Sequence, residues 1–195
     1  MGRHILIIQG HPDSGTAHFC HALADAYAVG AKSGGHEVRR LGVSELALPL
    51  LRSKAEWDRP TVSGVVRECQ ELIRWADHLV IVYPLWLGGM PAVLKGFFEQ
   101  VARPGFAIGK GEGSRPWMRL LKGKSARIVV TMGMPALVYR WYFGAHSLKS
   151  LERNILGFVG VAPIRETLIG MIDELSGAKR KAWLDRLQRL GVECA

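Results

Sequence analysis

The sequence predicts a doubly wound α/β fold, in which five parallel strands in the order 2-1-3-4-5 carry helices on both faces. Two observations support this prediction. Short, continuous apolar runs, typical of strands buried on both faces, alternate along the chain with segments whose apolar residues recur at helical spacing. The 195 residues also contain no internal repeat and no linker-like composition, so we expect a single domain over residues 1–195.

The first strand and helix have the clearest patterns. His4–Ile8 is a continuous apolar run and predicts a buried strand. Apolar residues at helical spacing over 17–31 predict a helix, which Gly34-Gly35 ends. A weaker strand is expected over Glu37–Gly42, and residues 45–60 show no pattern that predicts an element.

The rest of the chain repeats the alternation of strand and helix, interrupted by a Gly- and Lys-rich excursion over 103–124. Pro84 ends the next buried strand, and Pro91 suits the first turn of the helix that follows. The expected elements are a helix over 65–76, a strand over 79–83, a helix to 101, a strand over 126–131, a helix around 147–156, a strand around 161–169 and an amphipathic C-terminal helix around 183–190.

Charge and cysteine content exclude several classes of protein. The formal net charge of +9 suits anionic partners such as nucleotides, but the basic residues are scattered and predict no nucleic-acid interface. The three cysteines form no C-x-x-C pair, so we expect no disulfide framework and no metal site, and a reducing cytoplasmic location fits best. The apolar runs are short or interrupted, so no signal or transmembrane segment is expected, and nothing supports contact with a membrane surface.

A sheet of this topology binds ligands outside the carboxyl ends of strands one and three, where the chain reverses direction. The loop over Gly10–Thr16 follows strand one, so its backbone N–H groups and hydroxyls face any anion at the helix N-terminus. The alternative is that Ser14 or Thr16 only caps the helix and that His11 is an ordinary loop histidine. His18 and His21 lie on one helix face without an acidic companion, and we interpret them as solvated rather than as metal ligands.

Common nucleotide fingerprints are missing. The sequence has no G-x-G-x-x-G after strand one, and Gly123-Lys124-Ser125 precedes its strand instead of following it. An ordinary NAD dehydrogenase and a P-loop NTPase are therefore not expected. The loop over Tyr83–Pro91 is unusually apolar and suits a flat aromatic group such as a flavin ring, with Trp86 and Leu87 against it. The alternative is that Trp86 packs in a core or a dimer interface.

The residues of these two loops resemble the flavodoxin-like NAD(P)H:quinone reductases, a family that includes ancillary proteins of potassium efflux systems. The resemblance extends from the first strand to about Gly160, and its most specific part is the proline loop with the helix that follows. The matching motifs are His11-Pro12 with Thr16, Gln70, Ala76-Asp77, Tyr83-Pro84-Leu85-Trp86, Pro91-Ala92-Val93-Leu94-Lys95-Gly96-Phe97-Phe98 and Gly105-Phe106-Ala107.

The resemblance implies a bound flavin, FAD or FMN, with FAD favoured. It assigns the flavin phosphates to His11, Thr16, Ala17 and His18, the ring to Pro84, Leu85, Trp86 and Leu87, and the polar edge of the ring to Thr131, Met132 and Gly133. Ala17 and His18 stand where the relatives have Phe and Asn, and Met134 follows Gly133 where they have a second Gly.

The resemblance also implies an activity: hydride passes from NAD(P)H through the flavin to a quinone or similar aromatic acceptor, and the two substrates alternate in one site. Tyr139 and His146 would stabilise the charge that develops on the flavin's pyrimidine side. The alternative for this pair is a helix surface beside Trp141 and Tyr142. The basic charge favours NADPH over NADH, and a homodimer is expected because a second subunit commonly completes such sites.

Two other classes of function remain open. A regulatory flavoprotein would act through a partner such as a potassium efflux system, using the basic C-terminal helix, although a solvated helix face explains that charge equally simply. A one-electron carrier of flavodoxin type is disfavoured by the positive net charge.

Overall fold

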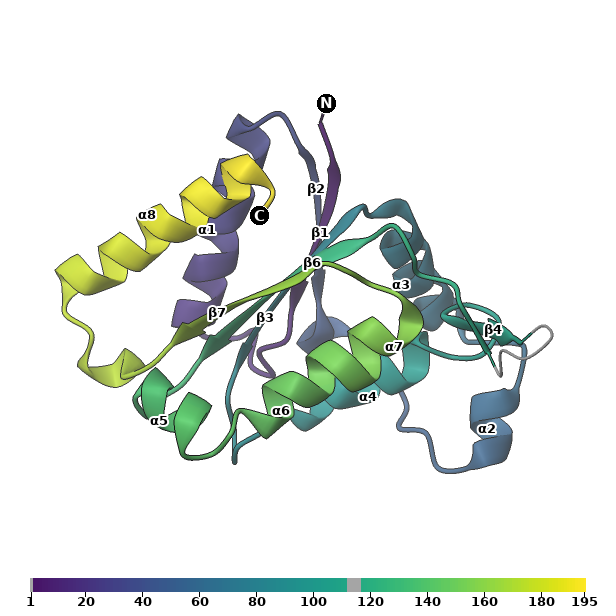
Figure 1. The fold of residues 1–195 in the computed structure, drawn as a ribbon. Helices are drawn as coiled ribbons and strands as arrows, with labels where there is room; N and C mark the ends of the chain where they lie inside the picture. The colour runs from purple at the N-terminus through teal and green to yellow at the C-terminus, as the bar shows by residue number, and fades with distance from the viewer. Residues whose placement is uncertain (1, 112–116) are drawn as a thin grey trace.

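The computed structural model describes residues 2–111 and 117–195. A five-stranded parallel sheet in the order β2-β1-β3-β6-β7 forms the central layer (Figure 1). Counted along the chain, these five strands have the order 2-1-3-4-5, so the predicted doubly wound fold is confirmed. The strands are β1 (His4–Gln9), β2 (Glu37–Gly42), β3 (His78–Pro84), β6 (Ser125–Thr131) and β7 (Ile164–Ile169).

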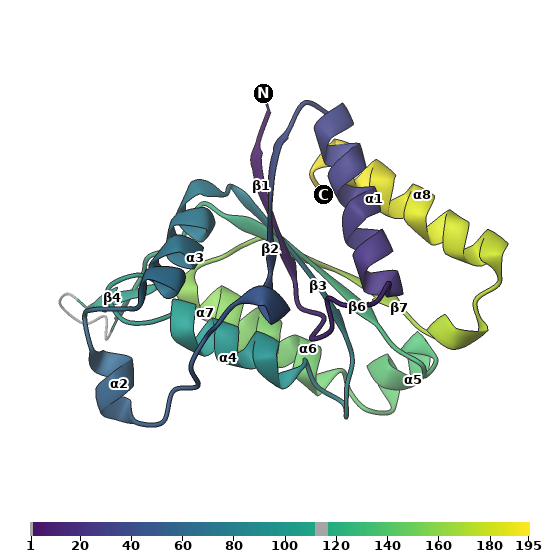
Figure 2. The same ribbon diagram turned by 180° about the vertical axis from the view of Figure 1, so that it is seen from behind.

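Helices cover both faces of this sheet (Figure 2). The helices α1 (Phe19–Ser33) and α8 (Gly177–Glu193) pack on one face. The other face carries α3 (Gly64–Trp75), α4 (Ala92–Val101) and a continuous helical run made of α6 (His146–Lys149), the π-helical η2 (Ser150–Leu156) and α7 (Gly157–Val159). Successive strand residues point to opposite faces, so Ile5 and Ile7 join the α1/α8 core while Leu6 and Ile8 join the α3/α4 core.

Several short elements were not predicted from the sequence. They are η1 (Val43–Glu45), α2 (Lys54–Asp58), the antiparallel pair β4 (Ile108–Lys110) and β5 (Trp117–Arg119), α5 (Ala136–Trp141) and η3 (Ile172–Glu174). Helix α2 buries no residue and is held by Ser53, whose hydroxyl accepts from the backbone N–H of Glu56, so it has no apolar periodicity to detect. Residues 112–116 of the predicted excursion lie outside the described part of the chain.

Strand β7 begins at Ile164, later than the 161 expected, because Pro163 has no N–H to donate to the ladder. Helix α1 likewise begins at Phe19, two residues later than predicted. In the described parts of the chain, no helix is both long and apolar enough to cross a bilayer.

Two glycines allow α1 and α8 to cross in close contact. A Cβ on Gly30 would lie 1.8 Å from the backbone oxygen of Gln188, and one on Gly191 would lie 2.2 Å from that of Tyr27. Real Cβ atoms do not approach backbone oxygens this closely, so any side chain at either position pushes the helices apart. These glycines set the distance between α1 and α8, the two helices that cover one face of the sheet.

We predict that Gly30→Ala lowers the free energy of unfolding by about 2 kcal/mol, because the overpacking outweighs the gain in helix propensity. The matched control is Gly177→Ala at the start of α8, where nothing lies within 4 Å of the new Cβ. Urea denaturation of both variants measures the difference. Equal stabilities for the two would contradict the close helix contact.

Candidate functional site

The predicted site lies where the carboxyl ends of β1, β3 and β6 meet. We call residues 10–18, which follow β1, the cradle loop, and residues 84–91, which begin at the last residue of β3, the proline loop. The N–H of Gly10 donates to Val82 O at 2.8 Å, and the N–H of Leu85 donates to Thr131 O at 2.7 Å. Backbone bonds therefore tie the start of the cradle loop to β3 and the start of the proline loop to β6.

The cradle loop rests directly on the start of α4. A Cβ on Gly10 would lie 2.7 Å from Leu94 Cδ2 and 3.1 Å from Tyr83 Cβ, so any side chain here requires the Leu94 side chain to shift. The two loops are thus held at a fixed separation by the packing beneath them.

The backbone N–H groups at the start of α1 are available to a ligand. Within the described chain, the N–H groups of Thr16, Ala17 and His18 donate to no protein acceptor. The N-cap residue is His18, which makes no side-chain capping bond, and the first turn of α1 has no acidic residue. Neither Ser14 nor Thr16 caps the helix, in contrast to the alternative considered from the sequence. These unpaired donors, at the positive end of the helix dipole, fit a phosphate.

Asp13 organises the loop from within. Its carboxylate accepts from the Thr16 hydroxyl and the Gly15 N–H and lies 2.8 Å from His18 Nε2. These bonds, led by the Thr16 hydroxyl and then His18, hold the pKa of Asp13 well below its usual range. Asp13 was not predicted as a site residue, because in the sequence it is indistinguishable from an ordinary turn aspartate.

Three imidazoles gather beside the cradle loop. His11 is only 6% exposed, and its ring stacks on that of His18 with centroids 3.8 Å apart. His21 lies edge-on to both rings, at 5.3 Å from His11 and 5.5 Å from His18. Burial lowers the pKa of His11, and the neighbouring His18 lowers it further. His21 was expected to be solvated, but the structure places it in this cluster. Among the described residues, no group of three or more His, Cys, Asp or Glu side chains is arranged to hold a metal ion.

The tip of the proline loop projects Trp86 and Leu87 outward, whereas Pro84 is buried and Leu85 packs partly against the core. Trp86 and Gly89 exchange two backbone hydrogen bonds of 2.9 and 2.8 Å, closing a tight turn in which Leu87 has φ +46° and Gly88 φ +75°. Leu87 is fully exposed and Trp86 is 52% exposed, so Trp86 is not a core residue. The Trp86 ring lies edge-on to His11, with centroids 6.0 Å apart, so the two loops meet at this point.

The turn after β6 offers less to a ligand than its three predicted residues suggest. The Thr131 side chain is buried, and its hydroxyl lies 3.1 Å from Cys20 Sγ. Met132 is also buried, and its N–H donates to Ile169 O. Gly133 is exposed, and its N–H has no acceptor in the described structure, so this group is the donor that the turn presents outward.

Tyr139 and His146 occupy different environments. Tyr139 is 2% exposed, and its hydroxyl accepts from the buried N–H of Leu148 at 3.2 Å. Burial raises the pKa of Tyr139. His146 lies at the surface, with its ring against Gly144, and the structure shows no contact between the two side chains. The proline loop approaches this segment, since a Cβ on Gly89 would lie 3.9 Å from Ser147 Oγ.

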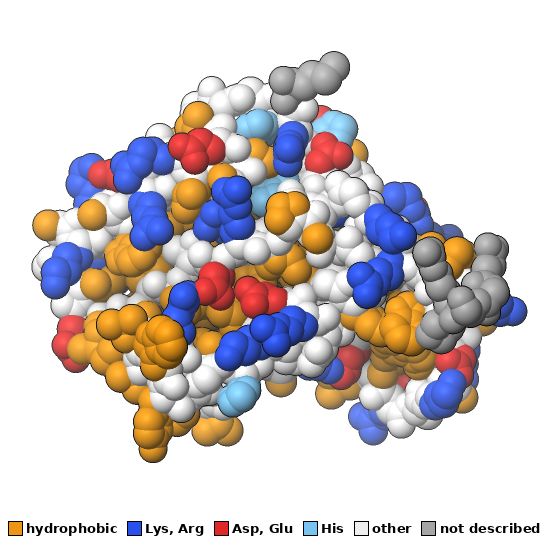
Figure 3. All heavy atoms as spheres, viewed as in Figure 1, with side chains coloured by type: hydrophobic (Ala, Val, Ile, Leu, Met, Phe, Trp, Pro, Cys, Tyr) orange, Lys and Arg blue, Asp and Glu red, His pale blue; other side chains and the backbone are white. Residues whose placement is uncertain are grey.

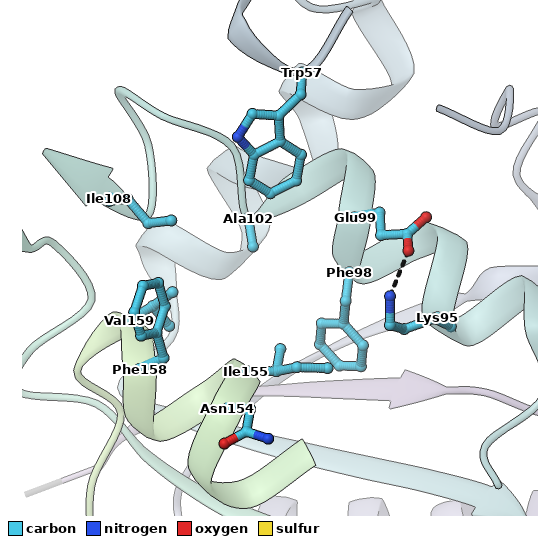
Figure 4. Close-up of a pocket in the computed structure, with 10 residues that line it drawn as sticks. All are labelled: Trp57, Lys95, Phe98, Glu99, Ala102, Ile108, Asn154, Ile155, Phe158 and Val159. Atoms are coloured by element: carbon cyan, nitrogen blue, oxygen red, sulfur yellow. Dashed lines mark hydrogen bonds and ion pairs between the residues drawn. The ribbon is translucent and has the colours of Figure 1, made fainter. Parts of the chain in front are cut away.

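An exposed apolar surface borders the site. Hydrophobic side chains gather over α5 (Figure 3), and the most exposed are Leu137, Trp141 and Tyr142. The apolar cavity of about 180 Å³ between α4, η2 and α7 lies elsewhere: its lining residues, shown in Figure 4, include none from the three loops.

Comparison with known proteins agrees with this architecture. A family model described as a flavodoxin-like fold matches residues 3–191, and the chain belongs to this family. An uncharacterised NAD(P)H oxidoreductase of Haemophilus influenzae is 28% identical over 184 residues, covering 92% of this chain and 90% of the relative. An FMN-dependent NADH:quinone oxidoreductase of Nitratidesulfovibrio vulgaris is 28% identical over 210 residues, covering 97% and 98%.

A solved structure supports the fold. The NAD(P)H:quinone oxidoreductase from Methanothermobacter marburgensis superposes with a TM-score of 0.83 at 24% identity, covering 100% of this chain and 98% of that one. The resemblance to flavodoxin-like NAD(P)H:quinone reductases that the sequence indicated is therefore confirmed, and with it the expectation of an oxidoreductase similar to that class.

We predict that Tyr139→Phe lowers the free energy of unfolding by about 1 kcal/mol, because it leaves the buried N–H of Leu148 without an acceptor. Tyr142→Phe is the matched control, since Tyr142 is 82% exposed and its loss of a hydroxyl should leave stability unchanged. Chemical denaturation compares the two. Unchanged stability in Tyr139→Phe would show that this hydrogen bond contributes nothing to the fold.

Proposed function

We propose that this protein is an NAD(P)H oxidoreductase that holds FMN at the carboxyl end of the sheet and passes hydride to a quinone or a similar aromatic acceptor. One observation carries the proposal: unpaired N–H donors at the start of α1 lie beside an outward-facing apolar loop, at the point where the sheet reverses direction. A nucleotide with a phosphate at one end and a flat, apolar ring at the other fits both features.

The phosphate would lie in the cradle loop. The N–H groups of Thr16, Ala17 and His18 have no protein acceptor in the described chain, the Thr16 hydroxyl belongs to the same loop, and His11 offers a buried imidazole. Together they supply dipolar donors along with groups able to carry positive charge.

The ring would lie against the proline loop. Trp86 and Leu87 would supply its apolar wall, with Pro84 and Leu85 packed beneath them, and the two backbone hydrogen bonds between Trp86 and Gly89 hold that turn in shape. At the polar edge of the ring, Gly133 would act through its N–H, while Thr131 and Met132, whose backbone groups bond to Leu85 and Ile169, would hold the turn in place. The bound flavin supplies the hydride chemistry; the chain positions it and excludes water.

The roles of Tyr139 and His146 follow from their environments. His146 is exposed near the proline loop and is proposed to hold or pass a proton on the pyrimidine side of the ring. The Tyr139 hydroxyl accepts from the Leu148 N–H and keeps its own hydrogen as a donor, so Tyr139 is proposed to support the segment that presents His146 and to donate toward the ring.

FMN is proposed in place of the FAD favoured from sequence, because the Nitratidesulfovibrio relative is named for FMN. The same relative is named for NADH, so the preference for NADPH stays a prediction without support here. A homodimer also stays a prediction; the exposed side chains of α5 are the surface that it would cover.

Flavin reconstitution tests the function directly. The purified protein, incubated separately with FMN and FAD and then gel-filtered, should retain FMN and show its visible absorption band. Stopped-flow addition of NADH or NADPH should bleach that band, and menadione should restore it. Retention of neither flavin would refute the proposal, whereas bleaching without reoxidation by menadione would refute the quinone acceptor alone.

Trp86→Ala should weaken FMN binding at least about fivefold, since an aromatic contact with the ring contributes about 1 kcal/mol in addition to the buried area. Because Trp86 is half exposed, the melting temperature should stay unchanged. Trp117→Ala, a partly exposed tryptophan on β5, is the matched control and should bind FMN normally. Titration of flavin fluorescence gives both affinities; equal values would argue against the ring position.

A further inference from the structure

The cradle loop lacks the residues that commonly neutralise a phosphate. No Lys or Arg occurs between Arg3 and Lys32, which includes the whole loop and α1 as far as Ala31. The arginines that approach from other elements are already engaged. Arg40 pairs with Asp25, and Arg180, which lies over Phe19, donates to Ile172 O and Leu175 O.

The carboxylate of Asp13 faces the same space and makes the need for positive charge greater. It lies 2.8 Å from His18 Nε2 and would repel a phosphate bound at the adjacent N–H groups. Among the groups described around this loop, the three imidazoles are those that can gain a charge near neutral pH.

The geometry leaves His11 ready to donate. Its Nδ1 lies 3.0 Å from the Asp13 carbonyl oxygen and 3.1 Å from the Asp13 nitrogen, so this ring nitrogen is held by the backbone. Nε2 has no hydrogen-bond partner in the described structure, although the residue is nearly buried. His18, stacked on this ring, pairs with Asp13, and His21 borders a hollow lined also by Asp25, Arg40 and Glu45.

We propose that His18 and His21, together with His11, make this loop selective for a phosphate monoester dianion, which binds together with a proton taken up by the imidazoles. The inference rests on the proposed function and deepens it, because it names the form of flavin that the chain selects. FMN carries both negative charges on one phosphate, whereas FAD carries one on each of two phosphates and riboflavin carries none.

The direction of the pH dependence follows from the electrostatics. With no anion present, burial and the neighbouring His18 lower the pKa of His11. A dianion beside these imidazoles favours the charged form, so binding takes up protons. Affinity for FMN should therefore fall as the pH rises, by about tenfold per pH unit for each proton taken up.

Isothermal titration calorimetry of the purified protein measures that proton. FMN and riboflavin are titrated separately at pH 7 in Pipes and in Bis-Tris, two buffers with different ionisation enthalpies. The expected result is uptake of about one proton per FMN and none per riboflavin, with FMN affinity falling between pH 7 and pH 8. FAD should bind more weakly than FMN and take up fewer protons.

The outcomes separate this inference from the proposed function. If FMN binds with no proton uptake, or if FMN and riboflavin show the same pH dependence, the imidazole mechanism is refuted while a flavin site stands. If no flavin binds at any pH, both proposals fail.

Substitutions test whether His18 and His21 are responsible for the proton uptake. His18→Asn combined with His21→Asn should abolish most of the proton uptake and reduce the preference for FMN over riboflavin by about tenfold. His4→Asn is the matched control, because His4 stacks on Trp75 at the opposite end of β1 and should leave FMN binding unchanged. Retained proton uptake in the folded double variant would refute the assignment.

Proton NMR of the unaltered protein provides a test that does not depend on a variant folding. With inorganic phosphate as the probe, titration of the imidazole resonances should show raised pKa values for at least two histidines. The absence of any phosphate-dependent shift would also overturn the proposal.

Discussion

The parallel pairing of β1 with β3 is the constraint on which the site depends. Because β2 lies on one side of β1 and β3 on the other, the chain winds away from this pair in both directions and leaves the two following loops side by side. The N–H of Gly10 bonds across to Val82 and fixes where the first loop begins. The unpaired donors of α1 and the apolar turn around Trp86 adjoin as a consequence of this topology.

Close packing beneath the loops makes this arrangement rigid. Gly10 packs directly on Leu94 of α4, so a side chain there would have to displace the Leu94 side chain. On the other side of the sheet, Gly30 and Gly191 let α8 cross closely over α1, the helix whose N-terminus forms the cradle. The position of the donors is therefore set by contacts among groups that never touch a ligand.

The ionisable side chains distinguish this site from other phosphate-binding loops. A loop built from N–H groups and hydroxyls can bind any phosphate. In this chain the loop also has a carboxylate and lies beside three imidazoles, and it contains no Lys or Arg. Charge in such a site varies with pH, whereas charge supplied by arginine does not. The charge of the bound phosphate and the protonation of the three imidazoles are thereby linked.

The sequence alone determined the fold, because buried strands and amphipathic helices leave periodic patterns that local reading detects, and it located the two principal loops. Tertiary structure alone decided which predicted side chains face outward. Thr131, Met132 and Tyr139 match the expected motifs yet are buried, with Thr131 beside Cys20 and Tyr139 bonded to Leu148. Asp13 and His21 became apparent only in the structure, where Asp13 contacts His18 and His21 lies edge-on to His11, because side-chain contacts within one loop and the helix that follows it leave no periodic signal in the sequence.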